Sequence, residues 1–151
     1  MLKLSQREEA LSRNIRLIEW TFDPLEMRNA HFNLNRLGAI VRRYLPNLYG
    51  ITSSPLHRGL ATDRLVAEWY LDSPRVLAAL ENQLPPPQHA SRIEIPATLE
   101  EWKLDDLSRV REVQSRIRWR FSDEFAKGHA AVSVIHGEHG SCYMLAPWSD
   151  D

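Results

Sequence analysis

The sequence predicts an α+β fold in which a mixed sheet is flanked by helices. Apolar residues at positions 27, 30, 34 and 37 recur at helical spacing. Three other segments, 15–22, 39–45 and 64–71, are rich in β-branched and aromatic residues, which favours strands. A strand–helix–strand order of this kind is typical of a sheet with helices packed on it. The 151 residues, 43% of them hydrophobic, are enough to build one core.

The first third of the chain contains clear helix boundaries. We expect a helix over 2–13 that ends at Asn14, because Asn tolerates the left-handed cap conformation. The strand 15–22 has apolar residues on both faces, which favours a buried central position. Asp23, Pro24 and Glu26 resemble an N-cap, a first-turn proline and a capping box, so a helix should begin there. Gly38 should end that helix.

The rest of the chain predicts shorter elements around a proline-rich segment. Residues 46–63 form a long loop between two strands, and Ser73–Pro74 begins a helix. The prolines of 84–90 favour an extended linker, so we divide the chain into a domain over 1–83, this linker, and an extension over 91–151. In the extension, 92–96 is a short strand, and Thr98 and Glu101 form a capping box that opens one long helix to about Lys127. A β-hairpin turning at Gly137–Gly140 ends the chain.

Composition excludes several kinds of partner and cofactor. A formal net charge of -1 gives no attraction to nucleic acid or to anionic membranes. No apolar run approaches the roughly 20 residues that span a bilayer, and no signal-peptide core is present. The single cysteine, Cys142, cannot form an internal disulfide, which favours a cytoplasmic location. His136, Glu138 and His139 do not have zinc-site spacing, so we expect a turn and no metal.

The stretch "WTFDPLEMRNAHFNLNRLGA" (20–39) resembles the C-terminal half of GNAT-superfamily N-acyltransferases. Their helix after the fifth strand typically ends in a Leu-Gly-aromatic signature, onto which Leu37 and Gly38 align. The alignment places Leu34 where the family often has a tyrosine, and Met27 where it has an asparagine. The family tyrosine often serves as general acid toward the CoA thiolate, so another group would have to take that role here.

The longer runs "IEWTFDPLEMRNAHFNLNRLGAIVRRYLPNLYG" and "HRGLATDRLVAEW" are similar to a bacterial subgroup of predicted GNAT acyltransferases. The resemblance covers about residues 2–75 and extends more loosely to the rest. Some members of this subgroup are linked to N-acylation of amino acids, including N-succinylation. The resemblance therefore implies transfer of an acetyl or succinyl group from acyl-CoA to a primary amine.

The glycine-rich loop that binds the CoA pyrophosphate in this family is not found in the sequence. The family's first four strands, with the carboxylate that often deprotonates the amine, would precede residue 1. We therefore expect a truncated domain that is weak or inactive alone, whose strand 15–22 forms an open edge. The alternative is a non-catalytic half-domain that forms a homodimer through this edge.

Candidate cofactor-binding residues lie on the helix that follows the first strand. Asn29 and Asn33 are four residues apart, on the side away from Met27. Each amide could donate and accept hydrogen bonds with the pantetheine of acyl-CoA, although a solvated helix face gives the same pattern. Asn is a mediocre helix former, so its repeated use favours a role.

Candidate catalytic and acceptor-binding residues lie in and beside the loop 46–63, which in the family lines the acceptor site. Tyr49 and Tyr44 are the candidate proton donors in place of the missing tyrosine. His57 and Arg58 are the candidate contacts to the acceptor, with Arg58 able to pair with an amino-acid carboxylate. Glu19 is a weak candidate for a base, and an ion pair with a neighbouring arginine is the better interpretation.

Overall fold

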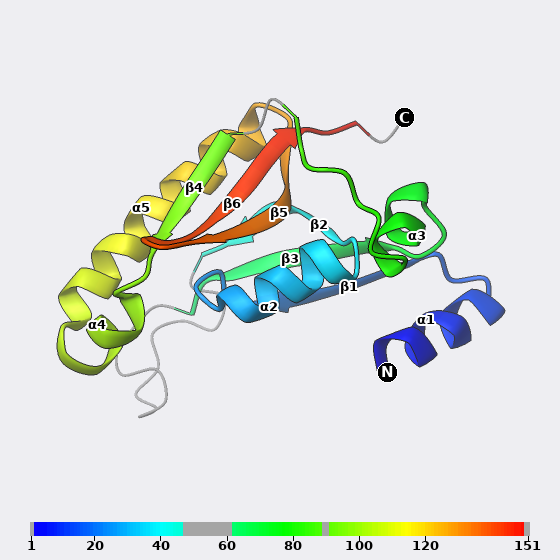
Figure 1. The fold of residues 1–151 in the computed structure, drawn as a ribbon, viewed down its shortest axis with the longest axis horizontal. Helices are drawn as coiled ribbons and strands as arrows, with labels where there is room; N and C mark the ends of the chain where they lie inside the picture. The colour runs from blue at the N-terminus through cyan, green and yellow to red at the C-terminus, as the bar shows by residue number, and fades with distance from the viewer. Residues whose placement is uncertain (1, 47–61, 89–90, 150–151) are drawn as a thin grey trace.

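The computed structural model describes residues 2–46, 62–88 and 91–149 (Figure 1). Six strands form one sheet, and helices cover it. In chain order the elements are α1 (Leu2–Ser12), β1 (Leu17–Phe22), α2 (Met27–His31), the π-helical turn η1 (Phe32–Arg36), β2 (Ile40–Leu45), β3 (Arg64–Tyr70), α3 (Pro74–Leu80), β4 (Ser91–Pro96), α4 (Leu99–Asp105), α5 (Leu107–Ala126), β5 (His129–Gly137) and β6 (Gly140–Pro147).

The α+β fold is confirmed, but the expectation of a mixed sheet is wrong. The strand order is β1-β3-β2-β5-β6-β4, and every pairing between described strands is antiparallel. β1 and β2 run in the same direction, because both are antiparallel to β3. β3 lies between them, so the strand–helix–strand unit produces no parallel ladder.

The sheet bends where β2 meets β5. Only Val41 and Ala131 are paired across this junction. In Figure 1 the strands β1, β3 and β2 accordingly diverge from β4, β5 and β6. Asn35 supports β5 beyond the junction: its Oδ1 accepts from the Val134 N–H at 2.9 Å, and its Nδ2 donates to the Val134 carbonyl at 3.3 Å. The side-chain amide thus replaces the neighbouring strand that β5 lacks.

One hydrophobic core joins both parts of the sheet to the helices. Ala30, Leu34 and Leu37 from the α2–η1 helix are completely buried in it, together with Phe121 of α5 and Tyr143 of β6. A smaller cluster lies on the opposite face of the sheet, around Ile40, Ala130 and Val132. β4, β5 and β6 therefore pack on the same core as the strands that precede the proline-rich segment.

The helix that follows β1 begins later than the sequence predicts. Asp23 does not cap it: its carboxylate accepts from the Leu25 N–H at 2.9 Å and closes a local turn. The helix begins at Met27, and Glu26 at its N-cap makes no side-chain capping bond. By contrast, Ser73 caps α3 as predicted, by accepting from the Val76 N–H at 3.2 Å. Asn14 also has the expected positive φ, at 63°.

The single helix predicted after Thr98 is two helices. Asp106 has an extended backbone, with φ -146° and ψ 76°, and separates α4 from α5. Its carboxylate accepts from the Ser108 hydroxyl at 2.7 Å, a local bond that competes with helix continuation. Thr98 makes no side-chain capping bond, so the predicted capping box is also wrong. The hairpin turning between Gly137 and Gly140 is confirmed.

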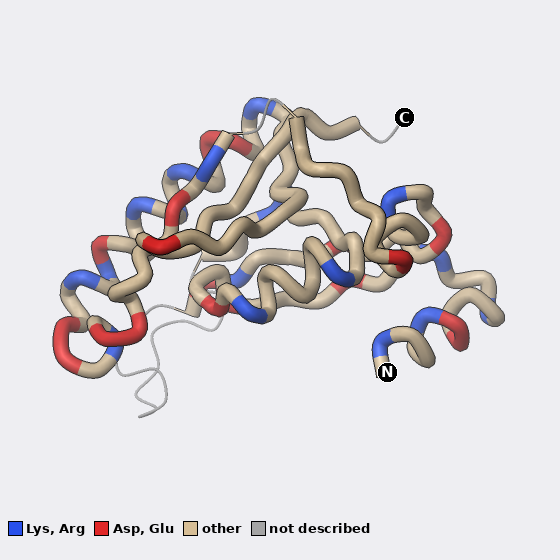
Figure 2. Tube along the Cα trace, viewed as in Figure 1, with Lys and Arg blue, Asp and Glu red and all other residues tan. Residues whose placement is uncertain are grey.

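Charged residues lie mainly on the outer helices. Figure 2 shows acidic and basic residues interleaved along α4 and α5, whereas most of the sheet carries neither. None of the helices in the described ranges combines the length and apolarity needed to cross a membrane.

β1 lies at the open edge of the sheet and is not the buried central strand that its apolar faces suggest. Ile18, Trp20 and Phe22 face the core, where Trp20 packs edge-on against Trp69 at 5.8 Å between ring centroids. Leu17 remains 37% exposed, and Ile15 before it 46%. Among the described strands β1 pairs only with β3.

Gly38 ends the α2–η1 helix in a crowded place. Its φ is +79°, and a Cβ added here would lie 2.9 Å from Ala79 Cβ and 3.0 Å from Val76 Cα. Gly128 has a similar φ of +84° but no atom within 4 Å of such a Cβ. Substitution of Gly128 therefore tests backbone strain alone, whereas substitution of Gly38 adds a steric conflict with α3.

We predict that Gly38→Ala lowers the free energy of unfolding by about 3 kcal/mol or more, whereas Gly128→Ala lowers it by about 1 kcal/mol. Both variants incur the left-handed strain, but only the first pushes α3 away. Urea denaturation of the two variants and the parent protein measures the difference. Equal decreases in the free energy of unfolding would show that α3 moves aside without an energetic penalty.

Candidate functional site

Half of the predicted site residues lie outside the described residues. Tyr49, His57 and Arg58 belong to the segment 47–61, on which the structure gives no description. Asn29, Asn33 and Tyr44 are described, and they lie in two different surroundings. Asn29 and Asn33 are on the α2–η1 helix, whereas Tyr44 is on β2.

Asn33 is buried without a hydrogen bond for its side chain. The residue is 4% exposed, and none of the described residues bonds its amide. Within the described part of the chain, the only fully enclosed side-chain donor or acceptor without a partner is Trp148 Nε1. The Asn33 amide therefore retains some access to the surface, while Asn29 is fully on the surface.

Asn33 also lies in an irregular part of the helix. The chain widens from α-helix to π-helix over Phe32–Arg36, with the Leu37 N–H donating to the Phe32 carbonyl at 2.9 Å. The Asn33 carbonyl accepts instead from the Ala39 N–H at 2.9 Å, beyond the Gly38 turn. Single π-helical turns are uncommon and occur frequently at functional sites. Sequence periodicity gave no indication of this turn.

Tyr44 is part of a buried network and faces the core. Its hydroxyl donates to Asp63, a completely buried carboxylate that also accepts from Arg118 Nε and Nη2 at 3.2 Å each. The ring packs on Phe121, with 5.6 Å between centroids. Burial and then the bond to Asp63 raise the pKa of Tyr44 well above its usual value. This arrangement ties Tyr44 to α5 and makes it a weak acid at neutral pH.

The other face of β1, β3 and β2 carries an ion cluster. Glu19 and Glu68 are directly opposite each other in the sheet register, which would be unfavourable without cations. A bulge in β2 places both Arg42 and Arg43 opposite one residue of β3. Arg42 binds Glu68 at 3.0–3.1 Å, and Arg43 pairs with Glu19. Tyr70 completes the cluster by donating to Glu68 at 2.7 Å.

Glu68 was not predicted as a site residue, although the sequence gave a signal. It is a carboxylate in the middle of the apolar strand "RLVAEWYL", and it is only 3% exposed. A charge at such a position indicates a buried ion pair. Glu19 takes the ion-pair role that was its alternative interpretation. The cluster explains how the sheet accommodates Glu19 and Glu68. Both carboxylates are paired with an arginine, so neither is free to act as a base.

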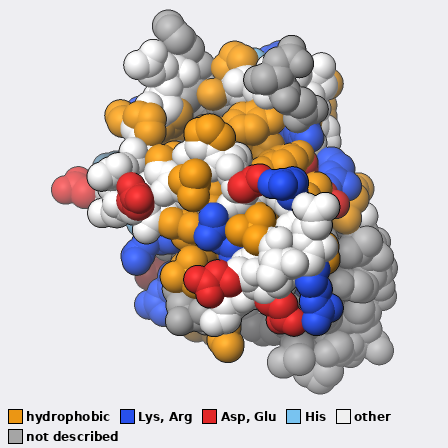
Figure 3. All heavy atoms as spheres, turned by 90° about the vertical axis from the view of Figure 1, so that its right-hand side faces the viewer, with side chains coloured by type: hydrophobic (Ala, Val, Ile, Leu, Met, Phe, Trp, Pro, Cys, Tyr) orange, Lys and Arg blue, Asp and Glu red, His pale blue; other side chains and the backbone are white. Residues whose placement is uncertain are grey.

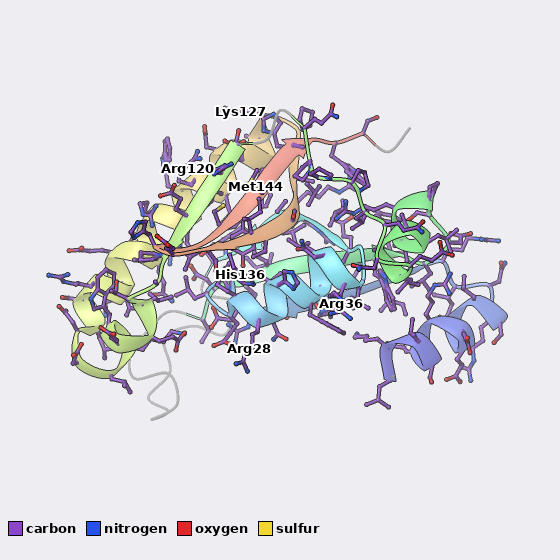
Figure 4. All side chains as sticks on the ribbon, viewed as in Figure 1. Arg28, Arg36, Arg120, Lys127, His136 and Met144 are labelled. Atoms are coloured by element: carbon purple, nitrogen blue, oxygen red, sulfur yellow. The ribbon has the colours of Figure 1, made fainter. Side chains whose placement is uncertain are left out.

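A cavity of about 510 Å³ lies between the start of α2 and the β5–β6 hairpin. His136 and Ser141 are on its wall, with 2.7 Å between Nδ1 and Oγ. His136 also stacks on His31, at 5.2 Å between ring centroids, and Figure 4 shows His136 beside α2. Burial and then the neighbouring His136 and Arg36 lower the pKa of His31.

The His136–Ser141 pair does not form a catalytic triad. No carboxylate in the described ranges bonds the other ring nitrogen of His136, which a Ser-His-Asp arrangement would require. Nor do the described residues gather three or more acidic, histidine or cysteine side chains that could hold a metal ion. Arg28, Glu26 and Glu100 line the same cavity, so its polar wall carries charges of both signs.

Comparison with known proteins gives no relative. No protein-family model, no curated protein sequence and no solved structure matches the chain. Functional inference therefore depends on the residues and on the geometry described above.

We predict that Tyr44→Phe lowers the free energy of unfolding by about 1–3 kcal/mol, because it removes a donor from the enclosed Asp63 carboxylate. Tyr70→Phe, the matched control, should cost less, because the Tyr70 phenol is much more exposed to solvent than that of Tyr44. Chemical denaturation at neutral pH compares the two variants. An unchanged stability of Tyr44→Phe would contradict the anchoring role of this hydroxyl.

Proposed function

We propose that this chain is the second half of a GNAT-type acyl-CoA-dependent N-acyltransferase. The transferred group would be acetyl or succinyl, and the acceptor a primary amine such as that of an amino acid. The observation that carries the proposal is the order α1, β1, α2–η1, β2, β3, with β1 at the open edge. This is the order that the sequence resemblance implies for the part of the domain that follows its fourth strand.

The burial of Asn33 and its lack of side-chain hydrogen bonds to described residues support the same proposal. Its amide is nearly buried, unbonded to described residues and held in a π-helical turn on the helix that should border the acyl-CoA cleft. The amide keeps only a small access to the surface, so few of its hydrogen bonds can be made to water. A pantetheine amide would supply both the donor and the acceptor that Asn33 lacks.

The proposed reaction is direct attack of the amine on the thioester carbonyl. The nitrogen–carbonyl bond forms, the amine proton passes to a base, and the carbon–sulfur bond breaks with release of the CoA thiolate. In this chain Asn29 and Asn33 would position the cofactor, and positioning is a large part of catalysis in such a transfer. Because Tyr44 is committed to Asp63, Tyr49 is the better candidate for protonating the thiolate, with His57 and Arg58 as acceptor contacts.

We predict that acetyl-CoA or succinyl-CoA binds the purified chain with a Kd of roughly micromolar order, while turnover is slow. Asn33→Ala and Asn29→Ala should each weaken binding about tenfold if the amides bond the cofactor. Gln83→Ala removes an exposed amide elsewhere and should leave the Kd within about twofold. Titration calorimetry gives the Kd values, and absence of any binding by the chain or its dimer would contradict the proposal.

A second candidate function is self-association through the β1 edge. It is favoured by the exposed Leu17 and Ile15 beside an edge that pairs with no described strand. In this case the chain would be a non-catalytic half-domain, and a second copy would extend the sheet.

We predict that Leu17→Lys shifts a dimer to monomer, because a lysine at an edge strand disfavours strand pairing. Leu104→Lys changes an even more exposed leucine, on α4, and should leave the mass unchanged. Sedimentation velocity at several concentrations measures both variants. A monomeric parent protein would exclude this second function.

A further inference from the structure

A second cavity, of about 680 Å³, lies between α3, the proline segment 84–87 and the strands β5 and β6. Its volume is within the range of small-molecule sites. The lining is largely apolar: Ala78, Leu84, Pro85, Pro86, Pro87, Val132, Ile135 and Trp148 contribute to it. Figure 3 views the molecule from the side of α1 and α3, where hydrophobic side chains cover much of the surface between scattered charges.

One cation lies in this apolar wall. Arg75 donates through Nε to the Gly38 carbonyl at 3.0 Å, and through Nη2 to the carbonyls of Leu34 at 3.2 Å and Val132 at 2.5 Å. No carboxylate of the described residues is in ion-pair distance of it. Burial alone lowers the pKa of Arg75 to about 10, so the group stays charged at neutral pH. A largely buried guanidinium usually has an acidic partner.

The guanidinium retains unused donors. All of the bonds to carbonyls come from Nε and Nη2, and none comes from Nη1. Nη1 is not among the fully enclosed unpaired atoms of the described chain, so it reaches open space. Arg75 lines the cavity, and its Nη1 carries two N–H groups that no described residue accepts.

Trp148 contributes its ring to the cavity wall. Trp148 Nε1 is enclosed and has no hydrogen-bond acceptor. Its backbone is fixed, because the Trp148 N–H donates to the Gly128 carbonyl at 3.0 Å. Unpaired buried N–H groups are rare in native proteins. Because Nε1 is enclosed, a molecule in the cavity would meet the Trp148 ring and not this donor. The Arg75 guanidinium is therefore the cavity group that suits a carboxylate, which only accepts hydrogen bonds.

The polar amide of Asn35 does not compete for such a ligand. Its Oδ1 and Nδ2 are already bonded to Val134, and Nδ2 also reaches Ser133 Oγ at 3.0 Å. The consecutive prolines opposite it favour an extended, stiff backbone, so little ordering is required when a ligand enters. The cavity thus offers one cationic position and a rigid apolar wall.

We propose that this cavity binds a small monocarboxylate with an apolar body. The carboxylate pairs with Arg75 Nη1, and the apolar body lies against the prolines, Val132 and Trp148. This inference is independent of the proposed acyl transfer, since the cavity involves neither Asn33 nor the β1 edge.

The test compares octanoate with octanamide, which has the same alkyl body but no charge. Calorimetry with the full chain should show octanoate binding at least tenfold more tightly than octanamide. Equal affinities, or no octanoate binding up to about 10 mM, would overturn the proposal.

Two variants locate the binding. Arg75→Gln should bind the two probes equally, if circular dichroism shows that it is folded. Because Arg75 also holds the backbone, Ala78→Phe is the second variant: it fills the cavity and leaves the Arg75 bonds intact, so octanoate binding should weaken at least tenfold. Ala126→Phe, at the exposed end of α5, is the matched control and should bind octanoate as the parent does. Unchanged affinity in Ala78→Phe would place any octanoate elsewhere and overturn the proposal.

Discussion

The arrangement of this fold depends on the Arg75 guanidinium at the end of the α2–η1 helix. It binds carbonyls of Leu34, Gly38 and Ala39, and that of Val132 in β5. A cation at a helix C-terminus is favourable because it meets the negative end of the helix dipole. Here the same cation also crosses to β5. It therefore fixes α3, the helix end and the second half of the sheet relative to one another, where strand pairing alone is sparse.

The bend between β2 and β5 shows why such side-chain bonds are needed. With one pair of residues linking the two strands, the sheet has lost most of its ladder there. Asn35 supplies backbone-like bonds to Val134, and Trp69 Nε1 donates to the Leu37 carbonyl at 2.7 Å from the opposite side. The bend lets one core pack against both parts of the sheet. Beside β5 and the proline segment, the bend leaves the space of the second cavity, which Arg75 lines.

Sequence reasoning found the elements whose signals are local. Ser73 with Pro74, the Gly38 stop and the Asn14 cap act within a few residues of themselves, so their positions were predictable. The failures involve distant partners. The bond from Tyr44 to Asp63, and that from Arg118 to Asp63, 55 residues earlier in the chain, could not be predicted from local patterns. Likewise, apolar residues on both faces of β1 could not distinguish a central strand from an edge strand with one partly exposed face.

The asparagines of the α2–η1 helix divide between structure and proposed function. The side-chain amide of Asn35 bonds the backbone of Val134 in β5, and a shift of the helix would break these bonds. Asn33 is only two residues away, yet the π-helical turn leaves its side chain without a bond to the described chain. A regular helix would keep the Asn33 carbonyl within its own ladder and not in a bond to Ala39 across the Gly38 turn. The helix is thus anchored at Asn35 and irregular at Asn33, and local irregularities of this kind are expected where a protein binds a ligand.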